Sequence, residues 1–366
     1  MQPRRARRLR WSVKSALAST IAFAHQRGLA AALARGPERP LVVCYHRVVD
    51  DFEAAARTEM RSMLTSRGMF ERHLDCIGRH FRFVSLDEIG ERLLSGVPFT
   101  ERVAAVTFDD GYHDVYEHAY PVLKRKGIPG AVFVVTDLVG RSLWQIHDRL
   151  YHLVAKAFAT WDDPRRELCG LLSDLGLPGP QITRPPAASR SPLLAVSALL
   201  PVLSQTNIHR VMDGLEASVG NGFYDIPKTL TWPMLAEMRR NGIIVGSHTR
   251  THVRLPMESP EIVAEELEGS KRELEQQLGG PIDHFAYPDG QFTGPVVAAV
   301  ARAGYRFAYT ACHHSVPEQS RLTIGRLLLW EESSVDTDRS FSPAVLKCQA
   351  HDLWPPARRC ARVHNA

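Results

Sequence analysis

The chain has 366 residues, 44% of them apolar and 23% charged, which is typical of a folded globular protein and excludes disordered and collagen-like chains. Eight basic residues and no acidic one stand in residues 1–35, so the formal net charge of +5 divides into +8 there and −3 over residues 36–366. A mildly acidic body argues against a nucleic-acid binder, which groups basic residues on its binding face. The six cysteines form no Cys-x-x-Cys pair, which favours free thiols in a reducing compartment over a disulfide framework.

Residues 1–38 are expected to form a basic tail or an amphipathic helix. Their uncharged run, Ser15–Gln26, has twelve residues, whereas a helix needs about 20 to cross a bilayer. The run is also a weak candidate for a signal peptide cleaved after Ala22-Phe-Ala24. A basic amphipathic helix could instead lie on an anionic membrane surface. Three alternatives stay open: a solvated tail of a cytoplasmic protein, peripheral contact with the inner membrane, or export.

Strands and helices alternate after this tail. Short apolar runs predict buried strands at Pro40–Tyr45, Phe81–Val84 and Val103–Phe108. Helical spacing from Val115 to Lys126 then leads to a strand at Ala131–Val135. This order predicts an α/β fold whose parallel strands are joined by crossover helices.

Residues 141–230 interrupt the alternation with helical stretches and a patch rich in proline and serine, Pro178–Pro201. We expect an insertion carried on a surface loop of the barrel. The elements expected after it are helices at Trp232–Asn241, Pro260–Leu278 and Pro295–Ala303, and strands at Ile243–Val245, Phe285–Tyr287, Phe307–Thr310 and within Arg321–Trp330. The barrel would thus occupy residues 39–335, followed by a poorly ordered C-terminal tail, 336–366.

Two polar segments follow predicted strands. Thr107-Phe-Asp-Asp-Gly111 ends the strand Val103–Phe108, and Ser247-His-Thr-Arg-Thr-His252 ends the strand Ile243–Val245. In a barrel of parallel strands, both ends lie on the face where active sites are built. Two imidazoles and a carboxylate leave coordination positions of a metal open for water or substrate. His248 and His252 would lie on one side if their loop turned as a helix.

The two neighbouring aspartates are expected to act differently. Adjacent strand residues point in opposite directions, so one of Asp109 and Asp110 can bind a metal while the other accepts a proton. A metal lowers the pKa of its bound water to about 7, so that a carboxylate is an adequate base. Each motif alone is explained more simply, as a turn or as chance spacing among sixteen histidines. Their occurrence together at two strand ends favours a catalytic metal site.

Here the chain resembles the polysaccharide deacetylase family, also called the NodB-homology or carbohydrate esterase 4 type. The resemblance rests on Thr107–Gly111, His248–His252 and Phe285-Ala-Tyr-Pro-Asp-Gly290, and Tyr45-His-Arg-Val48 is similar to exopolysaccharide-type members. It covers about residues 39–335. It implies a distorted (β/α)7 barrel that removes N-acetyl groups from an acetylated sugar or polysaccharide, with zinc or another divalent transition metal as cofactor.

The resemblance also implies roles for particular residues. By motif position, Asp109 would be the catalytic base, and Asp110, His248 and His252 would bind the metal. The oxyanion of the tetrahedral intermediate would lie against the metal and a backbone N–H near Tyr287.

Two departures from the family pattern bear on these roles. Ala286 stands where the family commonly has the arginine that positions the base, and the last strand, Arg326-Leu-Leu-Leu-Trp330, lacks the histidine that is commonly the general acid. We expect Arg326 to replace the guanidinium and His46 to be the acid. An ion pair at the barrel end and a hydrogen-bonded core histidine are the alternatives. Trp330 could stack on a sugar ring, with barrel packing as its alternative.

Hydrolysis of an N-acetylated glycan by a metal-activated water is therefore the expected function. A non-carbohydrate amide or an O-acetyl ester at the same metal site is one alternative, and a catalytically inactive glycan-binding member is another. The expected partner is an acetylated glycan, with no nucleic acid, and the basic N-terminus is a candidate for membrane contact. The motifs carry no information on oligomeric state.

Overall fold

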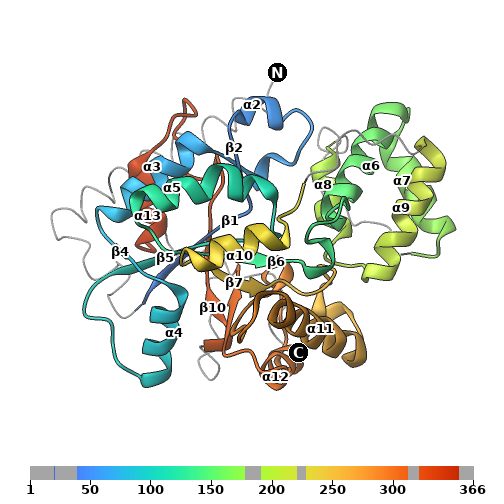
Figure 1. The fold of residues 1–366 in the computed structure, drawn as a ribbon. Helices are drawn as coiled ribbons and strands as arrows, with labels where there is room; N and C mark the ends of the chain where they lie inside the picture. Colours follow the sequence, from blue (N-terminus) through green and yellow to red (C-terminus); the bar gives the residue numbers. More distant parts are fainter. Residues whose placement is uncertain (1–19, 21–38, 178–190, 221–227, 312–320, 354–366) are drawn as a thin grey trace.

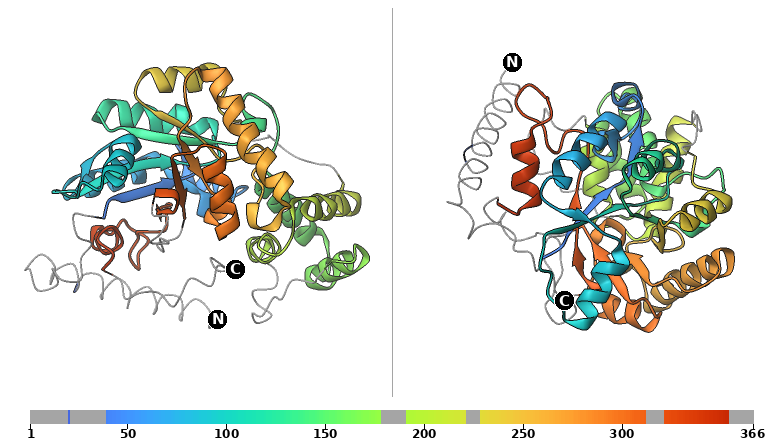
Figure 2. Two further views of the ribbon diagram at one scale, coloured as in Figure 1. Left: turned by 90° about the horizontal axis from the view of Figure 1, so that it is seen from below. Right: turned by 60° about the vertical axis from the view of Figure 1, so that its left-hand side comes forward.

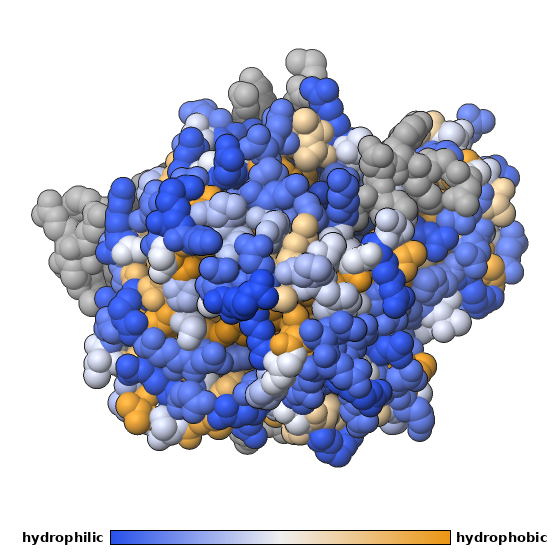
Figure 3. All heavy atoms as spheres, in the orientation of Figure 1, coloured by the Kyte–Doolittle hydropathy of each residue, from blue (hydrophilic) through white to orange (hydrophobic). Residues whose placement is uncertain are grey.

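The computed structural model describes Thr20 and residues 39–177, 191–220, 228–311 and 321–353. The expected N-terminal tail or amphipathic helix, residues 1–38, lies outside this description except for Thr20. Among the described residues, no helix combines the length and the hydropathy that a membrane span requires. Figure 3 shows a mostly hydrophilic surface on the face of Figure 1, with apolar side chains in small separate areas.

Parallel strands at the centre of the molecule form a sheet that is nearly closed into a ring (Figure 1). Six of them follow one another as β1 (Leu41–Tyr45), β5 (Val103–Phe108), β6 (Gly130–Val134), β7 (Ile244–Ser247), β8 (His284–Ala286) and β9 (Phe307–Thr310). The chain then forms β10 (Ile324–Gly325), which pairs with β9, and β11 (Leu327–Leu328), which pairs with β1. Because β10 and β11 are two pieces of one segment, the ring has seven strand positions. The predicted distorted (β/α)7 barrel is confirmed.

The strands are buried at the centre of the barrel because they carry apolar side chains on both faces. Every residue of β1, β5 and β6 is buried, as expected for parallel strands covered on both sides. The surrounding helices are α3 (Arg67–Gly78), α4 (Leu86–Ser95), α5 (Tyr120–Lys126), α10 (Trp232–Arg240), α11 (Pro260–Leu278) and α12 (Gly294–Arg302) (Figures 1 and 2). The predicted helix Val115–Lys126 is split, because Val115–Ala119 forms a π-helical turn before α5.

The structure differs from the expectation in three peripheral places. The strand predicted at Phe81–Val84 is only β4 (Arg82–Phe83), which pairs with β5 outside the ring. Between β1 and α3, two short strands, β2 (Arg47–Val49) and β3 (Leu64–Ser66), form a separate sheet, with helix α2 (Phe52–Ala55) between them. The C-terminal tail was predicted to be poorly ordered, and this is wrong for α13 (Pro343–Ala350). That helix buries apolar residues and packs against α3.

Four helices between β6 and α10 lie to one side of the barrel (Figure 1). They are α6 (Ile146–Thr160), α7 (Pro164–Asp174), α8 (Pro192–Leu199) and α9 (Gln205–Val219), and we call α6–α9 the helical segment. The segment has a hydrophobic cluster of its own, separate from the barrel core. On α6, Leu150, Leu153, Val154 and Ala157 are buried at the spacing of one helix face. This packing lets the segment fold as a compact body beside the barrel.

Candidate active site

Asp110, His248 and His252 meet at the carboxyl ends of β5 and β7. Asp110 Oδ1 lies 3.5 Å from His248 Nε2 and 3.3 Å from His252 Nε2. All three side chains are buried, and their ligand atoms lie within 4.8 Å of one another. Neither carboxylate oxygen of Asp110 has a hydrogen-bond partner among the described residues. A buried carboxylate in this condition is costly unless a cation binds it, and the donor set suits zinc or a similar divalent metal.

His248 is oriented by the neighbouring strand. Its Nδ1–H donates to the carbonyl oxygen of Ala286 at 2.8 Å, which leaves the lone pair of Nε2 facing Asp110. Burial lowers the pKa of His248 to about 4, so the ring is neutral near pH 7. Its main-chain N–H continues the sheet by donating to Val134. The strand ladder thus supplies both the place and the tautomer that a metal ligand needs.

The loop between His248 and His252 does not turn as a helix, which was the condition for the two side chains to lie on one side by their spacing alone. Thr249 and His252 have φ values of 68° and 63°, in the left-handed region that non-glycine residues rarely adopt. The Thr249 hydroxyl accepts from the His252 N–H at 2.9 Å. Glu266 of α11 accepts from the main-chain amides of Arg250 and Thr251 at 2.8 and 3.0 Å. These side chains stabilise a strained loop, as is common at functional sites.

Asp109 lies beside this set and is bound by an arginine. Arg326 Nη1 and Nη2 each donate to one oxygen of Asp109, both at 2.7 Å, and the guanidinium is only 1% exposed. The Cys44 thiol also donates to Asp109, at 3.3 Å. Burial raises the pKa of Asp109 and the charge of Arg326 lowers it, and the net direction is down. Asp109 is therefore an ionised carboxylate, and the structure places Arg326 where the guanidinium was expected.

A polysaccharide deacetylase family model matches residues 96–162 and 192–308, just over half of the chain. The chain belongs to this family. A poly-β-1,6-N-acetyl-D-glucosamine N-deacetylase of Staphylococcus aureus is 31% identical over 110 residues, which is 28% of this chain and 38% of that protein. YxkH of Bacillus subtilis, named as a polysaccharide deacetylase, is 42% identical over 43 residues, 12% of this chain and 15% of its own. The chain thus spans well under half the length of these curated relatives.

Solved structures show the same fold at low identity. The Streptococcus pyogenes deacetylase PplD has a TM-score of 0.54 and 18% identity, covering 86% of this chain and 100% of that one. IcaB from Ammonifex degensii has a TM-score of 0.53 and 20% identity, covering 86% of this chain and 98% of that one. The chain therefore shares its fold with these two proteins.

The structure places His46 near both aspartates of this deacetylase-family site. His46 directly follows β1, and its Nδ1 is buried with no hydrogen-bond partner in the described part of the chain. Burial raises the pKa of Asp109, whereas the nearby Arg326, His248 and His46 lower it. A core histidine satisfied by hydrogen bonds, the alternative interpretation, would not leave Nδ1 unpaired.

The main-chain N–H of Tyr287 is bonded within the sheet. Its N–H donates to the carbonyl oxygen of Tyr309 at 2.9 Å, because the ladder between β8 and β9 continues one residue beyond β8. The N–H of Tyr287 itself is thus already bonded, and the contact of an oxyanion with a main-chain N–H near Tyr287 stays a prediction. Trp330 is half-buried, and its main-chain amide donates to Ser333. Its stacking on a sugar stays a prediction.

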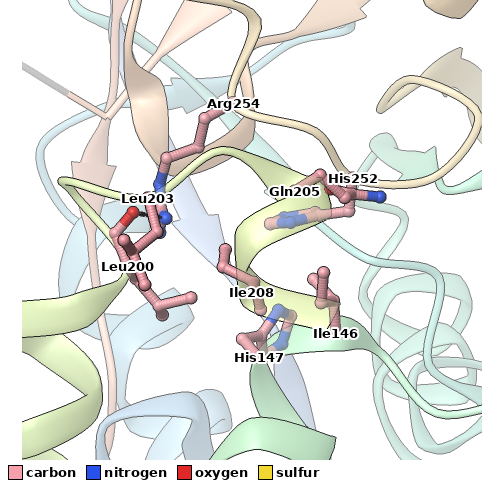
Figure 4. A pocket seen from close by; sticks show the side chains of 8 residues that line it. All are labelled: Ile146, His147, Leu200, Leu203, Gln205, Ile208, His252 and Arg254. Carbon is pink, nitrogen blue, oxygen red and sulfur yellow. Dashed lines mark hydrogen bonds between the residues drawn. The ribbon is translucent and has the colours of Figure 1, made fainter. Parts of the chain in front are cut away.

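The helical segment also reaches the site, which the sequence analysis missed. His147 Nε2 lies 3.7 Å from Asp110 Oδ2, and the rings of His147 and His252 are 5.1 Å apart. Arg254 forms an ion pair with Asp289 and donates to the carbonyl oxygen of Leu200. A small pocket is lined by both parts of the chain (Figure 4). Its lining residues are Ile146, His147, Leu200, Leu203, Gln205, Ile208, His252 and Arg254. No motif marks His147, which reaches Asp110 only through tertiary packing.

Proposed function

We propose that this chain is a metal-dependent hydrolase that removes N-acetyl groups from an acetylated sugar or polysaccharide. One arrangement carries the proposal: the buried cation set Asp110, His248 and His252 lies beside the Asp109–Arg326 pair at the carboxyl ends of the barrel strands. Family membership supports the amide of an acetylated glycan as the substrate. The partial match to the staphylococcal N-deacetylase supports N-acetylglucosamine as the sugar to test.

Asp110, His248 and His252 would hold the cation. When bound, a divalent metal such as zinc would supply Lewis-acid chemistry, lowering the pKa of water and stabilising negative charge on the acetyl oxygen. Asp109 accepts the proton of the attacking water, and Arg326 holds its carboxylate in place. The water oxygen adds to the acetyl carbon and the carbon–nitrogen bond then breaks. His46 gives a proton to the leaving amine, and acetate is released.

The first experiment measures metal content and acetate release from the purified chain. We expect a bound divalent metal, release of acetate from N-acetylglucosamine oligomers, loss of release with a chelator and its return with Zn²⁺. An O-acetylated glycan and a non-carbohydrate acetamide are tested beside the oligomers. If acetate were released from only one of these two compounds and not from the oligomers, that compound class would be the substrate in place of the N-acetylated glycan. A metal-bound chain that releases acetate from none of them would instead be an inactive glycan-binding member.

Replacing His46 by alanine should slow acetate release by about 100-fold or more, because the leaving amine then lacks a positioned acid. Metal content should not change, since His46 is outside the proposed ligand set. Initial rates and metal content are measured on the same preparations. The exposed His209 of α9 offers a matched control, and His209→Ala should keep the full rate. Unchanged turnover in His46→Ala would remove His46 from the mechanism.

A further inference from the structure

The beginning of α6 contacts the proposed metal ligand Asp110 at two points. Gln145, directly before α6, donates from Nε2 to the carbonyl oxygen of Asp110 at 2.7 Å. His147, in the first turn, lies 3.7 Å from Asp110 Oδ2. The two side chains are only 2% and 7% exposed. Asp110 has a φ of 70°, which for a residue other than glycine costs free energy that the surroundings must offset.

The hydrogen bonds around His147 decide which ring nitrogen carries a proton. The Tyr112 hydroxyl donates to Asp148 Oδ2 at 2.7 Å. A phenol has one proton, so at its 2.9 Å contact with His147 Nε2 the oxygen of Tyr112 accepts. His147 Nε2 therefore bears a hydrogen and has no lone pair for a metal. At 3.7 Å from Asp110, this N–H makes an electrostatic contact and not a full hydrogen bond.

The two oxygens of Asp110 consequently face different groups. Oδ1 faces the Nε2 atoms of His248 and His252, at 3.5 and 3.3 Å. Oδ2 lies 3.7 Å from His147 Nε2, the N–H of which donates to Tyr112. The positively polarised imidazole edge of His147 attracts Oδ2 and so favours the Asp110 rotamer in which Oδ1 points toward the proposed cation position. Groups outside the ligand set orient metal ligands in this way in other proteins.

The helical segment also holds the loop that carries the two histidines. Gln205 of α9 donates from Nε2 to the carbonyl oxygen and the hydroxyl of Thr251, at 3.1 and 2.8 Å. Its main-chain amide donates to Glu258 at 2.9 Å. Arg254, two residues after His252, binds the carbonyl oxygen of Leu200. The segment thus contacts the chain on both sides of the proposed cation site.

We infer that His147 and Gln145 are positioning residues for Asp110, so that docking of the helical segment and binding of the cation strengthen each other. This inference rests on the proposed cation site and not on the proposed hydrolysis. If the docked segment favours the binding geometry, then the bound cation must favour the docked segment by the same free energy. The helical segment would accordingly be part of the metal centre as well as a neighbour of the barrel.

Zinc affinity of the full chain tests the inference without an activity assay. The dissociation constant is measured by competition with a chromophoric chelator, with thermal unfolding as a check on folding. His147→Ala should bind Zn²⁺ about 10- to 100-fold more weakly. His147→Gln, which keeps an N–H donor, should recover part of the loss. His152→Ala is the matched control, because His152 lies on the same helix and contacts Glu59 and Trp144. It should bind as the unsubstituted chain does.

Hydrogen exchange supplies the reciprocal measurement. Zn²⁺ should slow amide exchange in α6 of the unsubstituted chain and have a smaller effect in His147→Ala. Equal zinc affinity of His147→Ala and the unsubstituted chain would overturn the inference while leaving the cation site in place. The inference would also be overturned if Zn²⁺ left the rate of amide hydrogen exchange in α6 unchanged. Absence of zinc binding by the unsubstituted chain would overturn the cation site and the inference together.

Discussion

Asp109→Asn should bind the metal as the unsubstituted protein does and release acetate about 10²- to 10⁴-fold more slowly. The amide cannot accept a proton from water, whereas the cation set Asp110, His248 and His252 is untouched. His248→Ala should lose metal and activity together, because it removes a ligand whose orientation is fixed by Ala286. Metal content and acetate release on the same samples separate the two variants.

A comparison of Asp109→Asn with Asp110→Asn discriminates between the neighbouring aspartates. Asp110→Asn should behave like His248→Ala, since the neutral amide weakens one of the three ligands. Loss of metal from Asp109→Asn in a folded sample would instead place Asp109 in the ligand set and contradict its assignment as base. Thermal unfolding of each sample shows whether the fold is retained.

Arg326→Met should lower the free energy of unfolding by about 3–5 kcal/mol, the usual cost of removing one partner of a buried ion pair. The guanidinium is 1% exposed and binds both oxygens of Asp109, so its loss leaves a buried carboxylate without its counter-ion. Acetate release should also fall, because the base is no longer held. Denaturant unfolding and initial rates measure the two effects.

Two further variants test whether the lost stability comes from the broken ion pair. Arg326→Lys keeps the charge but cannot form two parallel hydrogen bonds, so it should be intermediate in stability. The double variant Asp109→Leu/Arg326→Met removes both charges and should be more stable than Arg326→Met alone. A loss below about 1 kcal/mol in Arg326→Met would mean that the pair adds little to stability.

Apolar runs predicted the parallel strands because these strands are buried on both faces, and the resemblance to the deacetylase family implied that they form a barrel. The run Val103–Phe108 is β5 as predicted, and Phe307–Thr310 is β9. Short elements outside the ring were missed, because β2 and β3 have only three residues each and lack a periodic pattern. The prolines of the C-terminal segment obscured α13, in which Pro343 stands at the first helical position, where proline is tolerated.

Local motifs singled out Asp109 and the group Asp110, His248 and His252, which the structure brings together, since each motif lies at the end of a strongly apolar strand. Three features of the site depend on contacts between distant residues. Glu266 stabilises the left-handed loop before His252; Tyr309 occupies the N–H of Tyr287; and packing of α6 brings His147 to Asp110. Nothing in the local sequence distinguishes these residues from ordinary surface or core positions.

The split between β10 and β11 has a consequence for biosynthesis. Arg326 stands between the two pieces, where the last strand pairs with β1, and its side chain neutralises Asp109, the residue directly after β5. The two halves of this pair are 217 residues apart in the chain. During translation, Asp109 therefore has no Arg326 partner until the last strand of the ring has been synthesised and inserted. Closure of the barrel and formation of the Asp109–Arg326 ion pair are thus one event.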